Sequence, residues 1–208
     1  MTEYRDSAKK LLTDYPRPSV AVDTAVLTVK DGALCVALVQ NKEGWRLPGT
    51  FLHEHETLAD AVLRSLRDKA HIIGLRPRQL HVFDAPERDN RGWVISVAHL
   101  VAVPEASVSQ IELTPVSEAR DLVYDHREIL RMAVDTLRNS YQASPDPELL
   151  LGLEFTLLEL LRLHSAIAGE PLGKDTFRRR VLPQLSETDA YKPGLVGKPA
   201  KLFRHAAL

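Results

Sequence analysis

The most informative segment of the chain, residues 47–72, reads LPGTFLHEHETLADAVLRSLRDKAHI. Its second half carries small or apolar side chains at the spacing of one helix face, namely Leu58, Ala61, Val62, Ser65 and Leu66. Thr57 and Asp60 stand three residues apart, as the two members of a helix-capping box do. The segment therefore predicts an amphipathic helix from Thr57 to Ala70, entered from a polar loop.

Strand-like segments lie on both sides of this predicted helix. Val20–Val29 and Ala33–Val39 are rich in β-branched residues and flank Asp31-Gly32, a dipeptide that closes tight hairpins because it tolerates positive φ. The other predicted elements are two strands and a helix, at Gln79–Phe83, Trp93–Val103 and Tyr124–Ser140. We expect an α+β domain in which a mixed sheet packs between helices, with the long strand at 93–103 central in the sheet.

A proline-containing break, ASPDP at residues 143–147, ends this first part. We therefore expect two domains, residues 1–144 and 145–208. In the second, Thr156 and Glu159 form a capping box that begins a helix, Gly169 is placed to end it, and a further helix spans residues 174–182. Two strand-like runs follow, at 185–191 and 200–204. Helix, helix and β-hairpin is the order of a winged helix-turn-helix domain.

The composition, 44% hydrophobic and 26% charged residues, is that of a globular protein. No apolar run is long enough to cross a bilayer, and Met1–Lys10 is too polar for a secretory signal, so we expect a cytoplasmic location. Cys35 is the only cysteine, which excludes an internal disulfide and a thiolate zinc cluster. We expect its side chain to be packed in a strand.

Charge is distributed unevenly along the chain. The whole sequence has a formal net charge of −1, whereas residues 171–208 carry eight basic and three acidic side chains. Such a local excess of positive charge is typical of a surface that contacts phosphates, although a solvated surface shows it too.

Residues 47–72 resemble a Nudix box, the motif with which Nudix hydrolases bind divalent cations on a helix. Glu56, Arg64 and Leu66 match the family pattern. The helix carboxylates of the family are replaced here by Ser65, Asp68 and Lys69, so one of three survives and an ammonium stands beside it. The resemblance implies a Nudix fold, and the replacements predict that it has no bound metal and no catalytic residues.

A second segment, FDAPERDNRGWVISVA at residues 83–98, resembles the Pro-x-Arg-Asp-x-Arg-Gly motif of ADP-ribose-type Nudix proteins and their regulatory relatives. Arg88 and Arg91 offer planar donor forks suited to phosphate or ribose oxygens. Asp89 can accept from a hydroxyl or orient an arginine. The alternative interpretation is a surface turn whose salt bridge is satisfied internally.

The remaining predicted ligand-binding residues are Trp45, Arg46, Phe51, Glu56 and His126. Trp45 stands where an aromatic ring stacks on a base in nucleotide-recognising relatives, or it seals the edge of the sheet. His126 either reaches the binding pocket or caps the helix that it begins. The alternating His and Glu residues at 53–56 lie on a loop with no fixed scaffold, and we interpret them as solvent-facing rather than as a metal site.

The segment GKDTFRRRVL, residues 173–182, resembles the recognition helix of Nudix-related transcriptional regulators, a family that represses genes of NAD metabolism. Phe177 and Val181 would face the core, whereas basic side chains would face outward into the major groove. The second hairpin strand and its approach, GKPAKLFR at residues 197–204, resemble the wing of that family. The predicted DNA-binding residues are Lys174, Thr176, Arg178, Arg179, Arg180, Lys192, Lys198, Lys201 and Arg204.

The resemblance covers about residues 17–205 and implies a repressor that binds palindromic double-stranded DNA as a homodimer. Its effector would be ADP-ribose or a related NAD metabolite, bound without a cofactor. One alternative is an active ADP-ribose pyrophosphatase that uses Glu56 and Asp68 and carries an accessory winged helix. Another is a winged helix that binds proteins rather than DNA.

Overall fold

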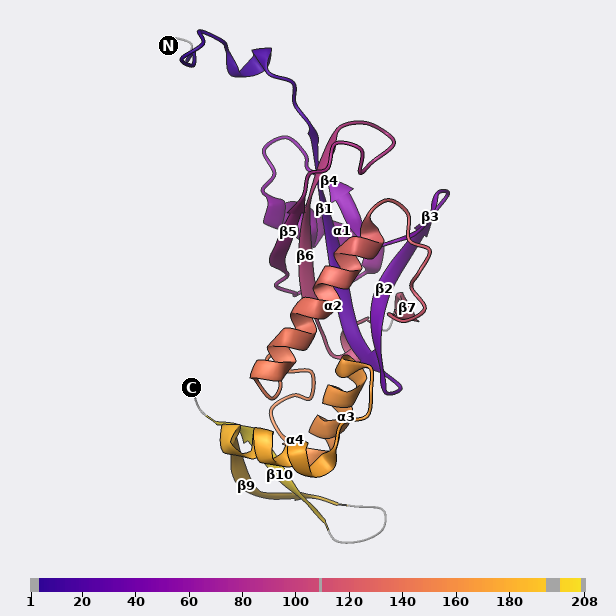
Figure 1. Ribbon diagram of the computed structural model, residues 1–208, viewed down its shortest axis with the longest axis vertical. Helices are drawn as coiled ribbons and strands as arrows, with labels where there is room; N and C mark the ends of the chain where they lie inside the picture. The colour runs from indigo at the N-terminus through magenta and orange to yellow at the C-terminus, as the bar shows by residue number, and fades with distance from the viewer. Residues whose placement is uncertain (1–3, 109, 194–198, 207–208) are drawn as a thin grey trace.

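The computed structural model describes residues 4–108, 110–193 and 199–206. The chain is elongated, with a large sheet-containing domain in the middle and a small domain at the end opposite to the N-terminal segment (Figure 1). None of the described helices is long and apolar enough to span a bilayer.

The large domain is built on a mixed sheet with the strand order β3-β2-β1-β6-β5. In addition, β4 pairs with β1 and β7 pairs with β2. The central strands β1 and β6 are parallel, whereas the other pairs in this sheet are antiparallel. The strands are β1 (Ser19–Lys30), β2 (Ala33–Asn41), β3 (Gly44–Arg46), β4 (Gly49–Phe51), β5 (Arg78–Phe83), β6 (Val94–Ala102) and β7 (Glu112–Pro115).

Local sequence signals explain the first elements. Asp31 and Gly32 have φ angles of 49° and 77°, so they make the tight β1–β2 turn that the sequence predicts. Helix α1 (Leu58–Ala70) begins at the predicted capping box, in which the Thr57 side chain and the Asp60 side chain each bond the other residue's backbone N–H. It ends at His71, which has a φ of 56° and lies in the left-handed region. The predicted hairpin and helix are therefore confirmed.

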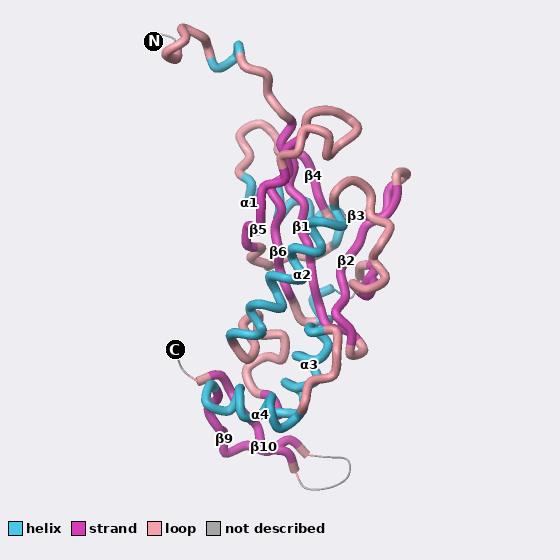
Figure 2. The backbone as a smooth tube through the Cα atoms, in the orientation of Figure 1, coloured by secondary structure: helices cyan, strands magenta, loops and turns pink. Residues whose placement is uncertain are grey.

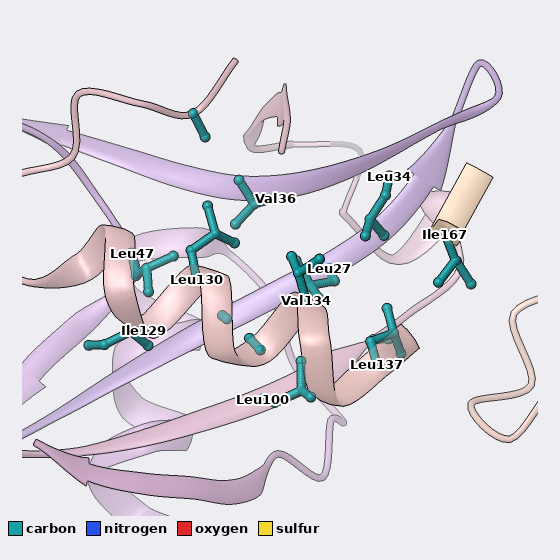
Figure 3. Packing of buried hydrophobic residues seen from close by; sticks show 14 of the residues in the cluster. Leu27, Leu34, Val36, Leu47, Leu100, Ile129, Leu130, Val134, Leu137 and Ile167 are labelled. Atoms are coloured by element: carbon teal, nitrogen blue, oxygen red, sulfur yellow. The ribbon is translucent and has the colours of Figure 1, made fainter. Parts of the chain in front are cut away.

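One helix packs on each face of the sheet (Figures 1 and 2). Val22 and Val26 of β1 pack in one cluster with Val62 and Leu66 of α1. Ala25 and Leu27, at the alternate positions of this pleated strand, face α2 (His126–Ala143) on the other side. Figure 3 shows this second cluster, in which the side chains of α2 pack on the sheet; its labelled residues are Leu27, Leu34, Val36, Leu47, Leu100, Ile129, Leu130, Val134, Leu137 and Ile167.

The predicted start of the second helix was wrong by two residues. Tyr124 has a φ of 58°, which an α-helix excludes, and α2 begins only at His126. Asp125 stands at the N-cap but makes no capping bond, because its carboxylate is engaged by Arg88. The helix thus starts later than predicted, at the point where the Asp125 side chain binds Arg88 and does not cap the helix.

The small domain has the winged-helix arrangement. Helices α3 (Leu157–Ala168) and α4 (Lys174–Val181) pack beside a three-stranded sheet with the order β8-β10-β9. The strands are β8 (Phe155–Thr156), β9 (Leu185–Lys192) and β10 (Ala200–His205). The core of the domain consists of Phe155, Leu160, Phe177, Val181 and Phe203. Thr156 caps α3 and Gly169 ends it with a φ of 82°, as predicted.

The two domains meet at the C-terminal end of α2. Leu163 and Ile167 of α3 belong to the same buried cluster as the sheet and α2. The Arg138 side chain of α2 donates from Nε to the Ile167 carbonyl oxygen over 3.0 Å. The domains therefore share apolar packing as well as a chain connection.

Candidate functional site

A cavity of about 230 Å³ opens beside the sheet where the three segments selected from the sequence converge. Strands β1 and β4, helix α1, the turn before β6 and the start of α2 contribute to its wall. The lining residues are Ala21, Asp23, Arg46, Gly49, Thr50, Phe51, Lys69, Arg88, Asp89, Arg91, Tyr124 and His126. Six of the eight predicted ligand-binding residues are therefore brought together.

Asp23, which the sequence analysis missed, is a buried carboxyl group in the wall of the cavity. Its Oδ2 atom accepts a hydrogen bond of 2.6 Å from the Ser96 hydroxyl and lies 3.8 Å from Nη2 of Arg88. A Cβ atom added to Gly49 would lie 1.8 Å from Asp23 Oδ1, so only glycine fits there. The signal available in the sequence was a lone carboxylate within the apolar run of the first strand.

His126 lines the cavity and is the first residue of α2, whereas the N-cap of the helix is Asp125. Its position therefore agrees with the pocket interpretation, and the capping interpretation is wrong. Its Nδ1 atom accepts a 3.0 Å hydrogen bond from the Leu47 backbone N–H. This bond places the proton of the neutral ring on Nε2, which lies 3.4 Å from Asp23 Oδ1. Burial lowers the pKa of His126, which keeps the ring neutral near pH 7.

The two arginines of the second motif are held differently. Arg88 is buried and donates from Nε and Nη2 to the Asp125 carboxylate over 2.7 and 2.5 Å. Arg91 donates to Asp89 over 2.9 and 2.7 Å, and its guanidinium lies 4.5 Å from the centroid of the Tyr124 ring. Asp89 thus orients an arginine, as one of the two predicted roles requires. The Arg91 side chain remains 41% exposed, so it has room to contact a ligand.

The residues of α1 that replace the Nudix-box carboxylates, Ser65, Asp68 and Lys69, do not form a metal site. The Ser65 hydroxyl is buried without a hydrogen-bond partner, and exposed Asp68 binds Arg67 over 2.7 Å. The Lys69 ammonium donates to the Gly49 carbonyl oxygen at the cavity. No group of three or more His, Cys, Asp or Glu side chains suited to a metal ion exists among the described residues. The side chains at these positions therefore do not fit a divalent cation.

Glu56 and Trp45 lie outside the cavity wall. The Glu56 carboxylate accepts two hydrogen bonds from Arg64, over 2.7 and 2.8 Å, and this partner lowers the pKa of Glu56 to about 2. Arg64 also donates to the Phe51 carbonyl oxygen, so the pair fixes the loop after β4. Trp45 is 36% exposed, and its carbonyl oxygen accepts from the backbone N–H of Val123. This position at the margin of the sheet agrees with the edge-sealing interpretation of Trp45.

Helix α4 presents the predicted basic surface. Phe177 and Val181 are buried in the small domain, which directs the other faces of the helix outward. Exposed polar and basic residues along it are Lys174, Thr176, Arg178, Arg179 and Arg180. Arg180, although exposed, also contacts its own domain: its Nη2 atom lies 3.2 Å from Nδ1 of His164, and its guanidinium lies over the Phe177 ring.

The wing residues have mixed environments. Lys192 of β9 pairs with Glu159, and Lys201 of β10 pairs with Glu187. Arg204 of β10 is exposed. Lys198 lies outside the described residues. The pairs on Lys192 and Lys201 are solvent-accessible, and such pairs exchange readily for phosphate contacts.

The fold and the cavity define a Nudix-fold domain joined to a winged-helix domain, which confirms the predicted fold class. Residues 148–205 match the family described as the NrtR DNA-binding winged helix domain. The chain is 33% identical to the ADPR responsive transcriptional repressor NtrR of Acinetobacter baylyi, covering 93% of this chain and 84% of that protein.

Two solved structures support the same assignment. Shewanella oneidensis NrtR complexed with a 27mer DNA is similar with a TM-score of 0.71 and 30% identity, over 90% of this chain and 93% of that one. The Nudix domain of the same protein complexed with ADP ribose matches with a TM-score of 0.55 and 28% identity, over 62% of this chain and 95% of that one. The chain belongs to the NrtR family of transcriptional repressors.

Proposed function

We propose that this protein is a cytoplasmic repressor of NAD-metabolism genes whose cavity binds ADP-ribose, or a closely related NAD-derived nucleotide, without hydrolysing it. The observation that carries the proposal is the joining of an exposed basic recognition helix to a cavity that lacks a metal-binding carboxylate set. The Acinetobacter repressor is named as ADPR responsive, and the Shewanella protein has been solved with DNA and with ADP ribose. These relatives support both DNA binding and ADP-ribose binding.

The cavity offers suitable groups for a nucleotide diphosphate linked to ribose. Arg91 is stacked on Tyr124 and lies 5.4 Å from the centroid of the Phe51 ring, so a planar cation and two aromatic rings lie together at the opening. The Nε2–H of His126 and the carboxylate of Asp23 are donor and acceptor groups for ribose hydroxyls. Because burial lowers its pKa, the His126 ring is already neutral near pH 7 and can donate from Nε2 without a change of protonation.

Hydrolysis is disfavoured by the same geometry. The alternative of an active pyrophosphatase needs Glu56 and Asp68 as metal ligands, but Arg64 holds the first and Arg67 holds the second. An intact effector suits a sensor, because a protein that destroyed its own signal would weaken the switch.

We further propose that α2 connects the cavity to the DNA-binding helix. Its first residue, His126, lines the cavity, and near its other end Tyr141 lies 5.2 Å from the His164 ring of α3. His164 in turn contacts Phe177 at 4.9 Å and Arg180, both on α4. A ligand that binds one position of α2 better than another changes the affinity for DNA, since only differential binding shifts such an equilibrium.

DNA binding would place α4 in the major groove, with arginine forks reading guanine edges and the wing lysines contacting phosphates. A homodimer on a palindromic site would present two copies of this helix one helical turn of DNA apart.

The test uses the full-length protein and a duplex that the protein itself selects from a random-sequence pool. Fluorescence anisotropy should show specific binding that weakens steeply with salt and changes by at least about fivefold with ADP-ribose. Chromatography after incubation with magnesium should recover ADP-ribose intact. Release of AMP and ribose 5-phosphate would support the pyrophosphatase, and failure to bind any duplex at low salt would support the protein-interaction module.

A further inference from the structure

We infer that Lys69 and Arg46 form a diphosphate site that works without a metal ion, the two cations of the chain doing what a divalent cation would otherwise do. The inference rests on the proposed function and specifies how the cavity recognises its ligand.

The first observation is the charge balance of the cavity wall. Four cationic side chains line it, together with the carboxylates of Asp23 and Asp89. Arg88 pairs with Asp125 and lies 3.8 Å from Asp23, and Arg91 pairs with Asp89. Within the described parts of the chain, no carboxylate lies within salt-bridge distance of the other two, Lys69 and Arg46. These two charges are therefore available for an anion.

The second observation concerns hydrogen bonding. The Nε atom of Arg46 is buried and has no hydrogen-bond partner, although such groups are nearly always satisfied in folded proteins. The Lys69 ammonium donates to the carbonyl oxygen of Gly49 and retains further N–H donors. Two cationic donors with unused capacity, on the wall of one cavity, match a ligand rich in acceptor oxygens.

The third observation is that the two charges disfavour each other without an anion. Burial is the largest cause that lowers the pKa of Lys69, and the positive charge of Arg46 is the next; the negative charge of Asp23 opposes them in part. A diphosphate, with two negative charges, would relieve this repulsion and supply the missing acceptors. Magnesium would instead meet an ammonium where the Nudix pattern has a carboxylate, so it would be repelled.

The experiment is calorimetric titration of ADP-ribose into the full-length protein, once with EDTA and once with magnesium. The wild type should bind with affinities that agree within about twofold in the two buffers. Lys69→Gln should lose about 10- to 100-fold in both, the usual range for losing a charged hydrogen bond. Arg67→Gln is the matched control, because it removes a different cation, on the exposed side of the same helix. This variant should bind like the wild type.

Lys69→Glu is the most discriminating variant, because it restores a carboxylate of the Nudix box. It should bind poorly with EDTA and regain affinity at least about tenfold when magnesium or manganese is added. Circular dichroism confirms that each variant is folded. A wild type that needs magnesium, or a Lys69→Gln variant with unchanged affinity, would overturn the inference.

A parallel arm separates this inference from the proposed function. Thermal unfolding is followed with millimolar inorganic pyrophosphate and no metal. If pyrophosphate stabilises the wild type but not Lys69→Gln while ADP-ribose fails to bind, the effector is wrong and the anion site stands. If neither compound binds the folded wild type, both proposals fail.

Discussion

His71 ends α1 in the left-handed region with a φ of 56°, and His55 before Glu56 also has a positive φ of 62°. Both histidines thus hold a backbone conformation that favours glycine. Because glycine adopts this conformation without a steric penalty, His71→Gly should raise the free energy of unfolding by about 0.5–1 kcal/mol. His71→Val should lower it, since a β-branched residue is strained there. Urea denaturation measures both, and equal stabilities would contradict the assignment of strain.

Gly49 has no room for a side chain in the cavity wall. A methyl group there would lie 1.8 Å from Asp23 Oδ1 and 2.9 Å from the backbone oxygen of Val22. Gly49→Ala should therefore destabilise the protein by about 1–3 kcal/mol, the usual cost of overpacking, and weaken ADP-ribose binding. Gly173→Ala, where nothing lies within 4 Å, is the control and should cost clearly less in the same urea titrations.

Site residues differ in how visible they are in the sequence. Arg88, Asp89 and Arg91 belong to one short motif, so the sequence was enough to select them together. Asp23 enters the cavity only because β1 pairs with β4 and β6, contacts that join residues far apart in the chain. Such a residue cannot be assigned by local pattern, since its role depends on which strands become neighbours.

Among the helices and strands, α4 is the element that we expect to contact DNA bases. Arg178 and Arg179 are exposed on the helix, so their replacement by alanine should cost about 1–3 kcal/mol each in specific binding while leaving far-UV circular dichroism unchanged. Anisotropy at a fixed salt concentration with the selected duplex measures the effect. Wild-type affinity in both variants would show that another element contacts the bases.

Helix α2 is the element that we expect to couple ADP-ribose binding to DNA binding. The Tyr141 hydroxyl donates a 2.6 Å hydrogen bond to buried Asp146, which also accepts from the backbone N–H groups of Leu150 and Leu151 at the domain junction. Tyr141→Phe should leave the affinity for ADP-ribose within about twofold but reduce its effect on DNA affinity several-fold. Ser140→Ala, next to it on the same helix, is the control. If Tyr141→Phe leaves the effect unchanged, coupling runs elsewhere.

The long elements could be predicted from the sequence, whereas the short strands could not. Strands β3, β4, β7 and β8 have between two and four residues, too few to display alternation. They exist because a neighbouring strand offers hydrogen bonds: β8 pairs with β10, for example, through Phe155 and Thr156. Pairing partners are a property of the fold, and a local pattern does not contain them.

For the whole molecule, three buried histidines predict a pH dependence of stability. Burial lowers the pKa of His99, His126 and His164. The unfolded chain then binds protons below about pH 6.5 that the folded protein does not. Stability should therefore be constant above about pH 7 and fall as the pH drops from 6.5 to 5.

Urea denaturation between pH 5 and pH 8 measures this dependence. The carboxyl groups with lowered pKa, such as that of Asp89, reduce the free energy of unfolding mainly near pH 4 and below. The change between about pH 6.5 and pH 5 is therefore due mainly to the histidines. His126→Gln should reduce the slope. A flat profile from pH 8 to pH 5 would contradict the neutral, buried state of these rings.

We propose that ADP-ribose and DNA bind to this protein in a linked manner. The most direct measurement is the affinity for ADP-ribose of the full-length protein, free and saturated with the selected duplex. We expect DNA to change this affinity by the same factor, at least about fivefold, by which ADP-ribose changes the affinity for DNA, as reciprocal linkage requires. Equal ADP-ribose affinities with and without DNA would contradict it.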